Sequence, residues 1–537
     1  MRRTAGEPSV SMCSIEVFDH KKSPKINAEH SRKMAGSRGQ SRHPLLHVTE
    51  LMLPPLGALK GSLSSGWAVI LAILLTAQSP ASRAGESSIA GALPGDQEFP
   101  ALGITADGGY SVWEDNRIDG NGRGVGIAAT RLDAGLTATG QVFRVNQLID
   151  GNQEKPQVLL LGNGNTLFAW EVRHGAKTGV YLRVLGTNGN FTSGDVLVNT
   201  PTWKQSYTQT TNWLAFYRNR LVNRRYRVRV KVENVREEAG GIALAALADG
   251  GALVAYHAMR RTETNTWDIR TNVYYNGVRS ITNAYIRPVR VGQDLMHDIF
   301  FQRLDSAGRK VGPEVLVNQY TAYNQRTPAV AVLADGRFVV AWVCEAPSTA
   351  DWRKNFQIDL YGRIFSPAGE PVGDEFPIAV EGDSDTDLIQ ANPALSALPG
   401  GGFAAFWSQQ ESTTSRRWDV YGGTFGADGM PTGSAFRLNE YTQGDQFGPK
   451  VAASGDRQLV VWTSVGQDGS REGVFGRFLA AGALDGSEFR VNTTTISRQI
   501  HPAVASDGQG RFFSVWSSFA GETGFDLFGR ILPGGGN

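Results

Sequence analysis

The sequence has little cysteine. Of its 537 residues, two are cysteines, Cys13 and Cys344. Cys13 lies in an N-terminal segment that we expect to be removed, so Cys344 would remain alone. That excludes an intramolecular disulfide and a cysteine-based zinc site in the mature chain. Stability then has to come from core packing, for which a hydrophobic content of 41% is sufficient.

An excess of either charge is also missing. The chain carries 53 Lys and Arg against 51 Asp and Glu. Without the first 84 residues it has four more acidic than basic residues. A mildly acidic chain lacks the positive surface that nucleic acids require, so we expect no nucleic-acid partner.

Long apolar runs are missing except for one, at residues 67–77. This run is too short to cross a bilayer as a helix. It fits the apolar core of a secretory signal, with Lys60 as its positive flank and small residues up to Ala81 or Ala84. We therefore expect residues 1–84 to be a leader and signal peptide, disordered or cleaved. The mature chain is expected to be extracellular or periplasmic, with no membrane span.

Common enzyme motifs are also absent: the sequence contains no G-x-S-x-G, P-loop or H-E-x-x-H. The histidines after the leader follow no metal-ligand spacing; they are His174, His257, His297 and His501. A glycosidase needs only two placed carboxylates, which spacing does not reveal. Candidates near a group of tryptophans are Asp268, Asp294, Asp351 and Glu345.

Glycine is abundant, and one sequence pattern recurs along the chain. The 64 glycines indicate many tight turns. Six times the chain has Gln-x-x-Pro, then a run of small residues, a turn, and an apolar run ending in Trp. The Gln positions are Gln97, Gln153, Gln325, Gln390, Gln446 and Gln499, and the Trp positions are Trp113, Trp170, Trp342, Trp407, Trp462 and Trp516. A seventh copy lacks the Gln-Pro start and has Tyr256 in place of Trp.

Each copy predicts four β-strands: a small-residue strand a, the Trp-bearing strand b, a "DLYGRIF" strand c and an "EFRVN" strand d. The segments alternate, are rich in β-branched and aromatic residues, and are too short for helices. One such sheet leaves both faces uncovered, whereas a ring of sheets covers them. We therefore predict an all-β protein, a seven-bladed β-propeller over residues 85–537 with strand a innermost. An open solenoid or two β-sandwiches are the alternatives.

The last copy, at 526–536, ends without a strand d. The N-terminal segment 87–90 aligns with the strand d of other copies. We expect this segment to complete the last blade, because such closure ties the chain ends together and removes an exposed sheet edge.

The stretch "VWEDNRIDGNGRGVGIAATRLDAG", residues 112–135, and the "D-[LV]-[YF]-G" strands carry a resemblance. They resemble the W-x-D-x-R … D-I-Y-x-x-R-x-D-x-x-G repeats of secreted bacterial β-propeller proteins, over residues 87–537. The resemblance implies an extracellular propeller and no particular activity, because that group has no single function.

Two insertions enlarge the third copy, at 203–238 before strand a and at 260–296 after strand b. Both fall on the face formed by the d-to-a and b-to-c connections, here called the loop face. Loops on a rigid scaffold are where binding usually occurs. An alternative register makes 267–277 the strand c and 298–308 part of an added hairpin.

The loop face is expected to carry aromatic and basic side chains. Five tryptophans lie outside strand b and the leader: Trp203, Trp213, Trp267, Trp352 and Trp418. They suit a glycan or protein ligand, or they pack the two insertions together as a small core. Alternate residues within 225–231 are basic, including Arg225, Arg227 and Arg229. This pattern indicates a cationic ribbon for an acidic partner, or charges that protect an edge strand.

The repeated polar residues suggest structural roles and one metal site. Gln325 with Asp359 exemplifies a pair that recurs blade by blade; a catalytic site is normally unique, so we expect hydrogen bonds between blades. Oxygen ligands cluster in a Gly-rich loop of the first copy and could hold Ca²⁺, although not at EF-hand spacing. They are Asp115, Asn116, Asp119 and Asn121. No other cofactor is expected.

Together these patterns favour a secreted, non-catalytic binding or interaction protein that recognises a glycan or a partner surface through a Trp-rich loop face. One alternative is a carbohydrate-active hydrolase or lyase that uses paired carboxylates. Another is a structural subunit of an extracellular assembly.

Overall fold

The computed structural model describes residues 85–91, 93–120, 123–173, 178–200, 206–217, 220–231, 239–259, 266–267, 269–275, 278–284, 296–321, 323–347, 356–379, 389–410, 417–519, 521 and 524–534. Within 206–231 and 266–284, and at 346–347 and 356–357, it describes the backbone alone. The predicted leader, 1–84, lies outside the described residues.

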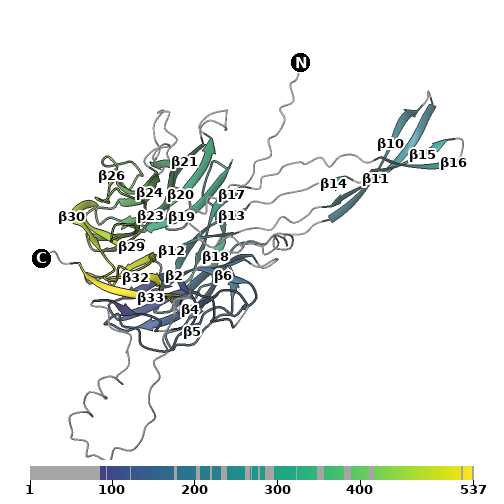
Figure 1. Ribbon diagram of the computed structural model, residues 1–537. Helices are drawn as coiled ribbons and strands as arrows, with labels where there is room; N and C mark the ends of the chain where they lie inside the picture. The colour runs from purple at the N-terminus through teal and green to yellow at the C-terminus, as the bar shows by residue number, and fades with distance from the viewer. Residues whose placement is uncertain are drawn as a thin grey trace, which may run out of the picture. The chain divides into compact units, whose positions relative to one another are not determined.

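Seven four-stranded antiparallel sheets form the blades (Figure 1). Blade one consists of β2 (Gln97–Thr105), β3 (Gly108–Asp115), β4 (Gly126–Leu132) and β5 (Phe143–Arg144). Blade two consists of β6 (Asn152–Leu160), β7 (Thr166–Arg173), β8 (Gly179–Leu185) and β9 (Val196–Leu197). Blade three consists of β12 (Ala239–Ala246), β13 (Ala252–Met259), β17 (His297–Leu304) and β18 (Lys310–Leu316). Blade four consists of β19 (Asn324–Val332), β20 (Phe338–Pro347), β21 (Phe356–Phe365) and β22 (Phe376–Ala379). Blade five consists of β23 (Gln390–Ala397), β24 (Phe403–Gln410), β25 (Trp418–Phe425) and β26 (Phe436–Arg437). Blade six consists of β27 (Gln446–Ser454), β28 (Arg457–Val465), β29 (Glu472–Ala480) and β30 (Ala483–Arg490).

Blade seven contains both ends of the described chain. Its order is β1 (Ser87–Ser88), β33 (Phe525–Pro533), β32 (Arg511–Phe519) and β31 (Gln499–Ser506). Ser88 pairs with Phe528, and the Ile89 N–H donates to the Leu527 carbonyl at 3.0 Å. The predicted closure is confirmed.

The first strands of the blades form a closed ring. β2 contacts β6, and contacts continue through β12, β19, β23, β27 and β31 back to β2. Only the innermost strands of a propeller meet all round in this way, so the small-residue strands surround the axis. The all-β, seven-bladed propeller is therefore confirmed.

The two insertions of blade three pair with each other rather than with a blade. β10 (Ser206–Tyr217), β11 (Arg220–Lys231), β14 (Thr266–Trp267), β15 (Ile269–Tyr275) and β16 (Val278–Ala284) form a separate sheet. β17 pairs with β13 as strand c of blade three, so the alternative register was wrong. β11 lies between β10 and β15 and is not an edge strand. The prediction that its arginines protect an edge strand was therefore wrong.

In all seven blades the register between strand a and strand b shifts near the start of strand a, at the Gln-x-x-Pro segment of six blades and at Gly240–Ala243 of blade three. The residue before the proline has a positive φ, for example 51° at Lys155 and 53° at His501. This conformation is costly for a side chain other than glycine and needs support from the surroundings. The Gln side chains are buried, with 0% exposure at Gln153 and Gln446.

Repeated side chains join each blade to the next. Glu488, of the "EF" in blade six, accepts the Glu440 and Tyr441 backbone N–H groups at 2.9 Å. Glu86 does the same for Thr493 and Thr494, so it supplies the acid that the last copy lacks. The ring therefore closes with the same hydrogen bonds that join its interior blades.

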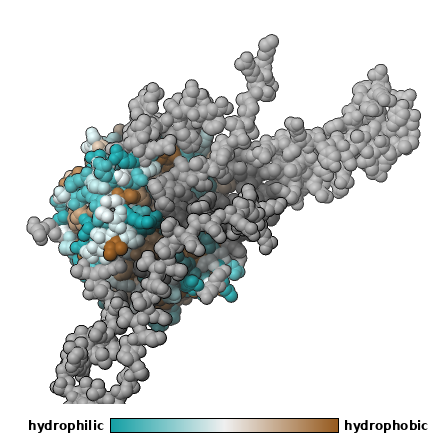
Figure 2. All heavy atoms as spheres, in the orientation of Figure 1, coloured by the Kyte–Doolittle hydropathy of each residue, from teal (hydrophilic) through white to brown (hydrophobic). Residues whose placement is uncertain are grey.

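The core lies between neighbouring blades. All six repeat tryptophans and Tyr256 are buried, at 0–1% exposure. On the coloured part of the surface in Figure 2, hydrophilic residues predominate and hydrophobic ones form small separate patches. In the described part of the chain, no helix has the length and apolar character needed to cross a membrane.

Candidate functional site on the loop face

The blades differ most in sequence where strand a begins and strand b ends, on the loop face close to the axis of the ring. The position after the Trp or Tyr of strand b is occupied by Glu114, Glu171 and His257 in blades one to three. In blades five to seven it is occupied by Ser408, Thr463 and Ser517. Ionisable groups therefore gather on the first half of the ring.

Glu171 lies at the centre of this region. Its side chain is 0% exposed, and it accepts the Gly241 backbone N–H of the next blade at 2.5 Å. Arg173 Nη2 lies 3.3 Å from Glu171 Oε2, and Lys155 Nζ lies 3.9 Å from the same oxygen. Burial of this carboxylate is thus offset by one backbone donor and two cations.

Blade three makes room for these side chains with two glycines. A Cβ at Gly240 would lie 2.8 Å from the Glu171 carboxyl carbon. Gly241 has a φ of +65°, and a Cβ there would lie 2.4 Å from His257 Nδ1. The loss of Gln-x-x-Pro from this copy therefore has a steric reason: only glycine leaves space for both groups.

Two histidines continue the site into blade four. The rings of His257 and His297 meet edge to face with their centroids 5.1 Å apart. Asn324 Oδ1 accepts the His297 backbone N–H and lies 3.2 Å from His297 Nδ1. Asn324 Nδ2 in turn donates to Glu345 Oε2 at 2.7 Å.

Glu345 was a candidate catalytic carboxylate in the sequence. It is 7% exposed and has an ion pair with Arg326, whose Nε lies 3.7 Å from its Oε1. The other three candidates, Asp268, Asp294 and Asp351, lie outside the described residues. Buried carboxylates from blades two and four, Glu171 and Glu345, thus lie on either side of the histidines of blade three.

Burial lowers the pKa of His297 to about 4, and the nearby Arg326 charge contributes. Burial also holds the pKa of His257 well below its usual value, as do His297, Lys155, Arg326 and Arg173. Both rings are therefore neutral at pH 7, and a neutral imidazole offers one donor and one acceptor. Among the described residues, His257 Nδ1 is buried without a hydrogen-bond partner.

An aromatic pair occupies the same end of the ring in blades one and seven. Phe99 and His501 precede the prolines of their strands, as Lys155 does in blade two. Their rings stack with centroids 3.8 Å apart and an interplanar angle of 19°. An aromatic pair thus lies at the positions where blade two has the charge of Lys155.

We call the group of ionisable residues in blades two to four the polar cluster. Its members are Lys155, Glu171, Arg173, His257, His297, Arg326 and Glu345. The cluster offers cationic donors and neutral imidazoles to a ligand, while its carboxylates are largely buried. Among the described residues, no three His, Cys, Asp or Glu side chains converge as a metal site would need.

The predicted tryptophan surface receives one correction. Trp418 is the first residue of β25 and is 7% exposed, so it is a buried residue and no exposed anchor. It is buried because it lies within a regular strand of blade five rather than in a loop. Trp203 and Trp352 lie outside the described residues, and Trp213 and Trp267 lie on strands described by backbone alone.

The three predicted ligand-binding arginines lie on β11. Arg225, Arg227 and Arg229 occupy alternate positions of that strand, which agrees with the predicted alternation. Arg227 pairs with Thr210 on one side and with Arg270 on the other. Their side chains lie outside the description, so an acidic partner for them stays a prediction.

The predicted calcium ligands are used in hydrogen bonds within the protein. Asp115 is 2% exposed, and its Oδ1 accepts the Arg117 and Ile118 backbone N–H groups at 2.7 and 2.9 Å. Asn116 is bonded to Asp96 through its Nδ2, at 2.9 Å. Asn121 lies outside the described residues.

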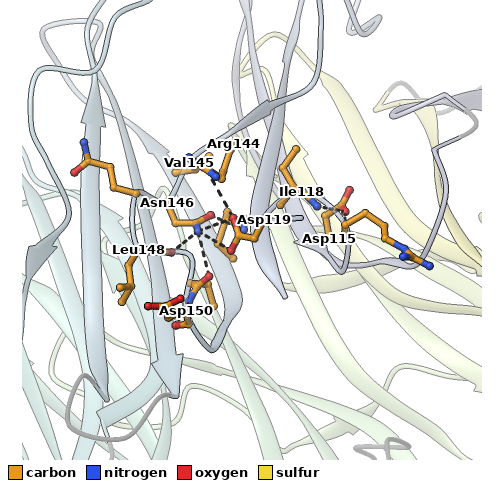
Figure 3. Close-up of polar contacts among 12 residues, drawn as sticks. Asp115, Ile118, Asp119, Arg144, Val145, Asn146, Leu148 and Asp150 are labelled. Carbon is orange, nitrogen blue, oxygen red and sulfur yellow. Dashed lines mark hydrogen bonds and ion pairs between the residues drawn. The ribbon is translucent and has the colours of Figure 1, made fainter. Parts of the chain in front are cut away.

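Asp119 has a different role, which Figure 3 shows. Gly126 stands where other copies have the strand-c aspartate, and a Cβ there would lie 2.5 Å from the Asp119 carboxyl carbon. Asp119 accepts from Asn146 Nδ2 at 3.0 Å, as Asp419 accepts from Asn439 in blade five. The loop residue therefore replaces the missing repeat residue. These geometries give no support to calcium binding, which stays a prediction.

The same asparagines confirm the expected bonds between blades. Asn146 Nδ2 lies 3.1 Å from the Gln153 Oε1 of the next blade, and Asn492 Nδ2 lies 3.2 Å from Gln499 Oε1. The repeated Gln and Asp residues are thus structural.

Of the polar cluster, the sequence pattern predicted Glu345 alone and missed the other six residues. The sequence does contain a signal for the cluster, since His257 follows the aromatic residue of the copy that lacks Gln-x-x-Pro. A departure from a repeat marks a position at which packing alone does not determine the residue type. That departure by itself does not predict the cluster, because contacts among three blades are not visible in the sequence.

No family model matches the chain, and no curated protein matches it. Among solved structures it is similar to a protein of unknown function from Dyadobacter fermentans, at 12% identity and a TM-score of 0.42, over 70% of this chain and 93% of that one. It is similar to the polysaccharide lyase Uly1 at 9% identity and a TM-score of 0.44, over 82% of this chain and 90% of that one. It is similar to an α-L-arabinofuranosidase from Fusarium graminearum at 10% identity and a TM-score of 0.41, over 74% of this chain and 97% of that one. Likenesses this distant carry no argument about function, and the fold assignment rests on the strand pairing.

Proposed function

We propose that the protein is a secreted, non-catalytic binding protein that recognises a glycan at the polar cluster. The observation that carries this proposal is the combination, at one end of the ring, of hydrogen-bonding groups in blades two to four with the stacked Phe99 and His501.

A sugar ring presents hydroxyl groups at its edges and C–H groups on its faces. The edges need side chains that donate and accept hydrogen bonds, and the faces pack on aromatic rings. The polar cluster offers the first, with Arg173 and two neutral histidines, and the stacked pair offers the second. The proposed export of the chain is supported by the apolar run at 67–77 and its small-residue flank.

The two insertions of blade three join the propeller at the polar cluster. His257 lies near the end of β13, before the second insertion, and His297 begins β17 after it. The proposal assigns Trp213 and Trp267, on the inserted strands, to recognition of the same glycan.

A glycan array on the mature protein tests the proposal. We expect a signal that His257→Ala and Phe99→Ala each reduce. Met430→Ala is the matched control, because Met430 is 62% exposed in the turn between β25 and β26, on the opposite face. No signal with the wild type, or a signal that both site variants leave intact, would refute the proposal. Trp267→Ala tests separately whether the inserted sheet takes part.

A second candidate is a carbohydrate-active hydrolase or lyase, favoured by Glu171 and Glu345 on either side of the histidine pair. Against it, each carboxylate already has a cation, and an ion-paired carboxylate accepts hydrogen bonds rather than supplying a proton. Chromatography of each glycan after incubation separates the two functions. Shorter products from the wild type, absent with Glu345→Gln, would replace binding with catalysis.

A further inference from the structure

Lys450 is unusual for its place in the fold. It follows the proline of Gln-x-x-Pro in β27, on the innermost strand of blade six. In the other copies with this proline the position holds Ala101, Gln157, Ala329, Ala394 or Ala503. The four alanines are buried, at 8–9% exposure, whereas Lys450 is exposed. Since alanine satisfies packing at this position, the lysine has to be explained by something other than the core.

Lys450 lies on a strand of the inner ring and its side chain is exposed, so it opens toward the axis. Desolvation by the surrounding protein lowers its pKa, and the charge of Lys155 in blade two lowers it further. No carboxylate among the described residues offsets the charge of Lys450.

Cations are also the more accessible charges of the polar cluster. The side chains of Lys155 and Arg173 are 41% and 42% exposed, whereas that of their partner Glu171 is 0% exposed. Arg326 is 23% exposed and its partner Glu345 is 9% exposed. A ligand that approaches along the axis meets positive charge first, and the carboxylates lie behind it.

We propose that the glycan is acidic and that Lys450, together with the accessible cations of the polar cluster, binds its carboxylate or sulfate groups. This inference rests on the proposed function and names its ligand class. An anion that binds Lys450 gains a charge-assisted hydrogen bond from an ammonium group that has no carboxylate partner in the described protein. The neutral histidines of the polar cluster then bind sugar hydroxyl groups.

The repeat supplies variants that are compatible with the fold. Lys450→Ala installs the residue of blades one, four, five and seven, and Lys450→Gln installs that of blade two. Lys310→Ala is the control, because Lys310 is an exposed lysine at the start of β18, the outer strand of blade three. Circular dichroism and thermal melting of all three should show an intact propeller.

Calorimetric titration with uronic-acid, sulfated and neutral oligosaccharides of one length tests the inference. We expect the wild type to prefer an acidic ligand by about tenfold or more, with affinity that falls as salt rises. The uronic-acid and sulfated arms identify the anion. Lys450→Ala and Lys450→Gln should each lose about tenfold in affinity for that ligand and little for the neutral one, and Lys310→Ala should match the wild type.

The alternative outcomes separate this inference from the proposed function. Equal binding of neutral and acidic ligands, or unchanged affinity in Lys450→Ala, would overturn the acidic ligand while leaving glycan binding in place. No binding of any oligosaccharide would overturn both. Tighter binding of a polyglutamate peptide than of any acidic oligosaccharide would identify an acidic protein surface as the partner and refute the glycan.

Discussion

Asn146 offers the sharpest test of how the blades are held together. It is 1% exposed, and its Oδ1 accepts the Ile127 backbone N–H at 2.8 Å. Its Nδ2 reaches Asp119 at 3.0 Å, the Leu148 carbonyl at 2.6 Å and Gln153 at 3.1 Å (Figure 3). One side chain thus joins strand c, strand d, the b-to-c loop and the next blade.

Asn146→Ala leaves the Ile127 N–H and the Asp119 carboxylate buried without this partner. Each buried polar group that loses its partner costs about 1–3 kcal/mol, so we expect a loss of about 3–5 kcal/mol in the free energy of unfolding. At an unfolding entropy of about 2 cal/mol/K per residue, a propeller of about 450 residues would melt about 3–5 °C lower.

Differential scanning calorimetry measures this change. The control is Asn190→Ala, because Asn190 has an exposed side chain in the turn after β8. In a double-mutant cycle, Asp119→Ala should cost less in the Asn146→Ala background than in the wild type, since the stranded carboxylate is then gone. A melting temperature of Asn146→Ala within about 1 °C of Asn190→Ala, or strict additivity in the cycle, would refute the reasoning.

Three further predictions concern the ring closure and the site. Ile89→Ala should lose about 2–4 kcal/mol, because Ile89 is 3% exposed between the last and first blades, and hydrogen exchange in β33 should rise with it. Gly241→Ala should shift the His257 ring resonances and lower glycan affinity, whereas Gly91→Ala, at a φ of +73° with nothing within 4 Å of its Cβ, should change only stability. His297, with a pKa lowered to about 4 by burial, binds its proton more readily when unfolded, so it contributes stability above pH 6.5 that is lost as the pH falls toward 4. The loss is about 3 kcal/mol, and denaturant titrations at several pH values should show a flatter dependence in His297→Asn; equal slopes would contradict the assignment.

The repeat made the architecture predictable. Strand order, blade number and closure by residues 87–90 all followed from one pattern written seven times, because every copy has to bury the same faces against identical neighbours. Trp418 shows where this reasoning stopped: its position between copies suggested a loop, but strand c of blade five begins at that residue and buries it.

The site could not be predicted in the same way. Asp119 seemed to be a metal ligand because it lies among other oxygen-bearing residues in sequence, whereas its actual partner, Asn146, is 27 residues away. His257 and Glu345 lie in different blades, and nothing in their spacing indicates that they belong to one cluster.

The sequence by itself determined the blades, since alternation, small-residue strands and buried tryptophans are local properties that repeat along the chain. Only the tertiary structure decided which side chains form the polar cluster, because the packing of neighbouring blades brings together residues that are far apart in the sequence. The tertiary structure also explains Gly240 and Gly241 of blade three. They leave room for the Glu171 and His257 side chains between neighbouring blades.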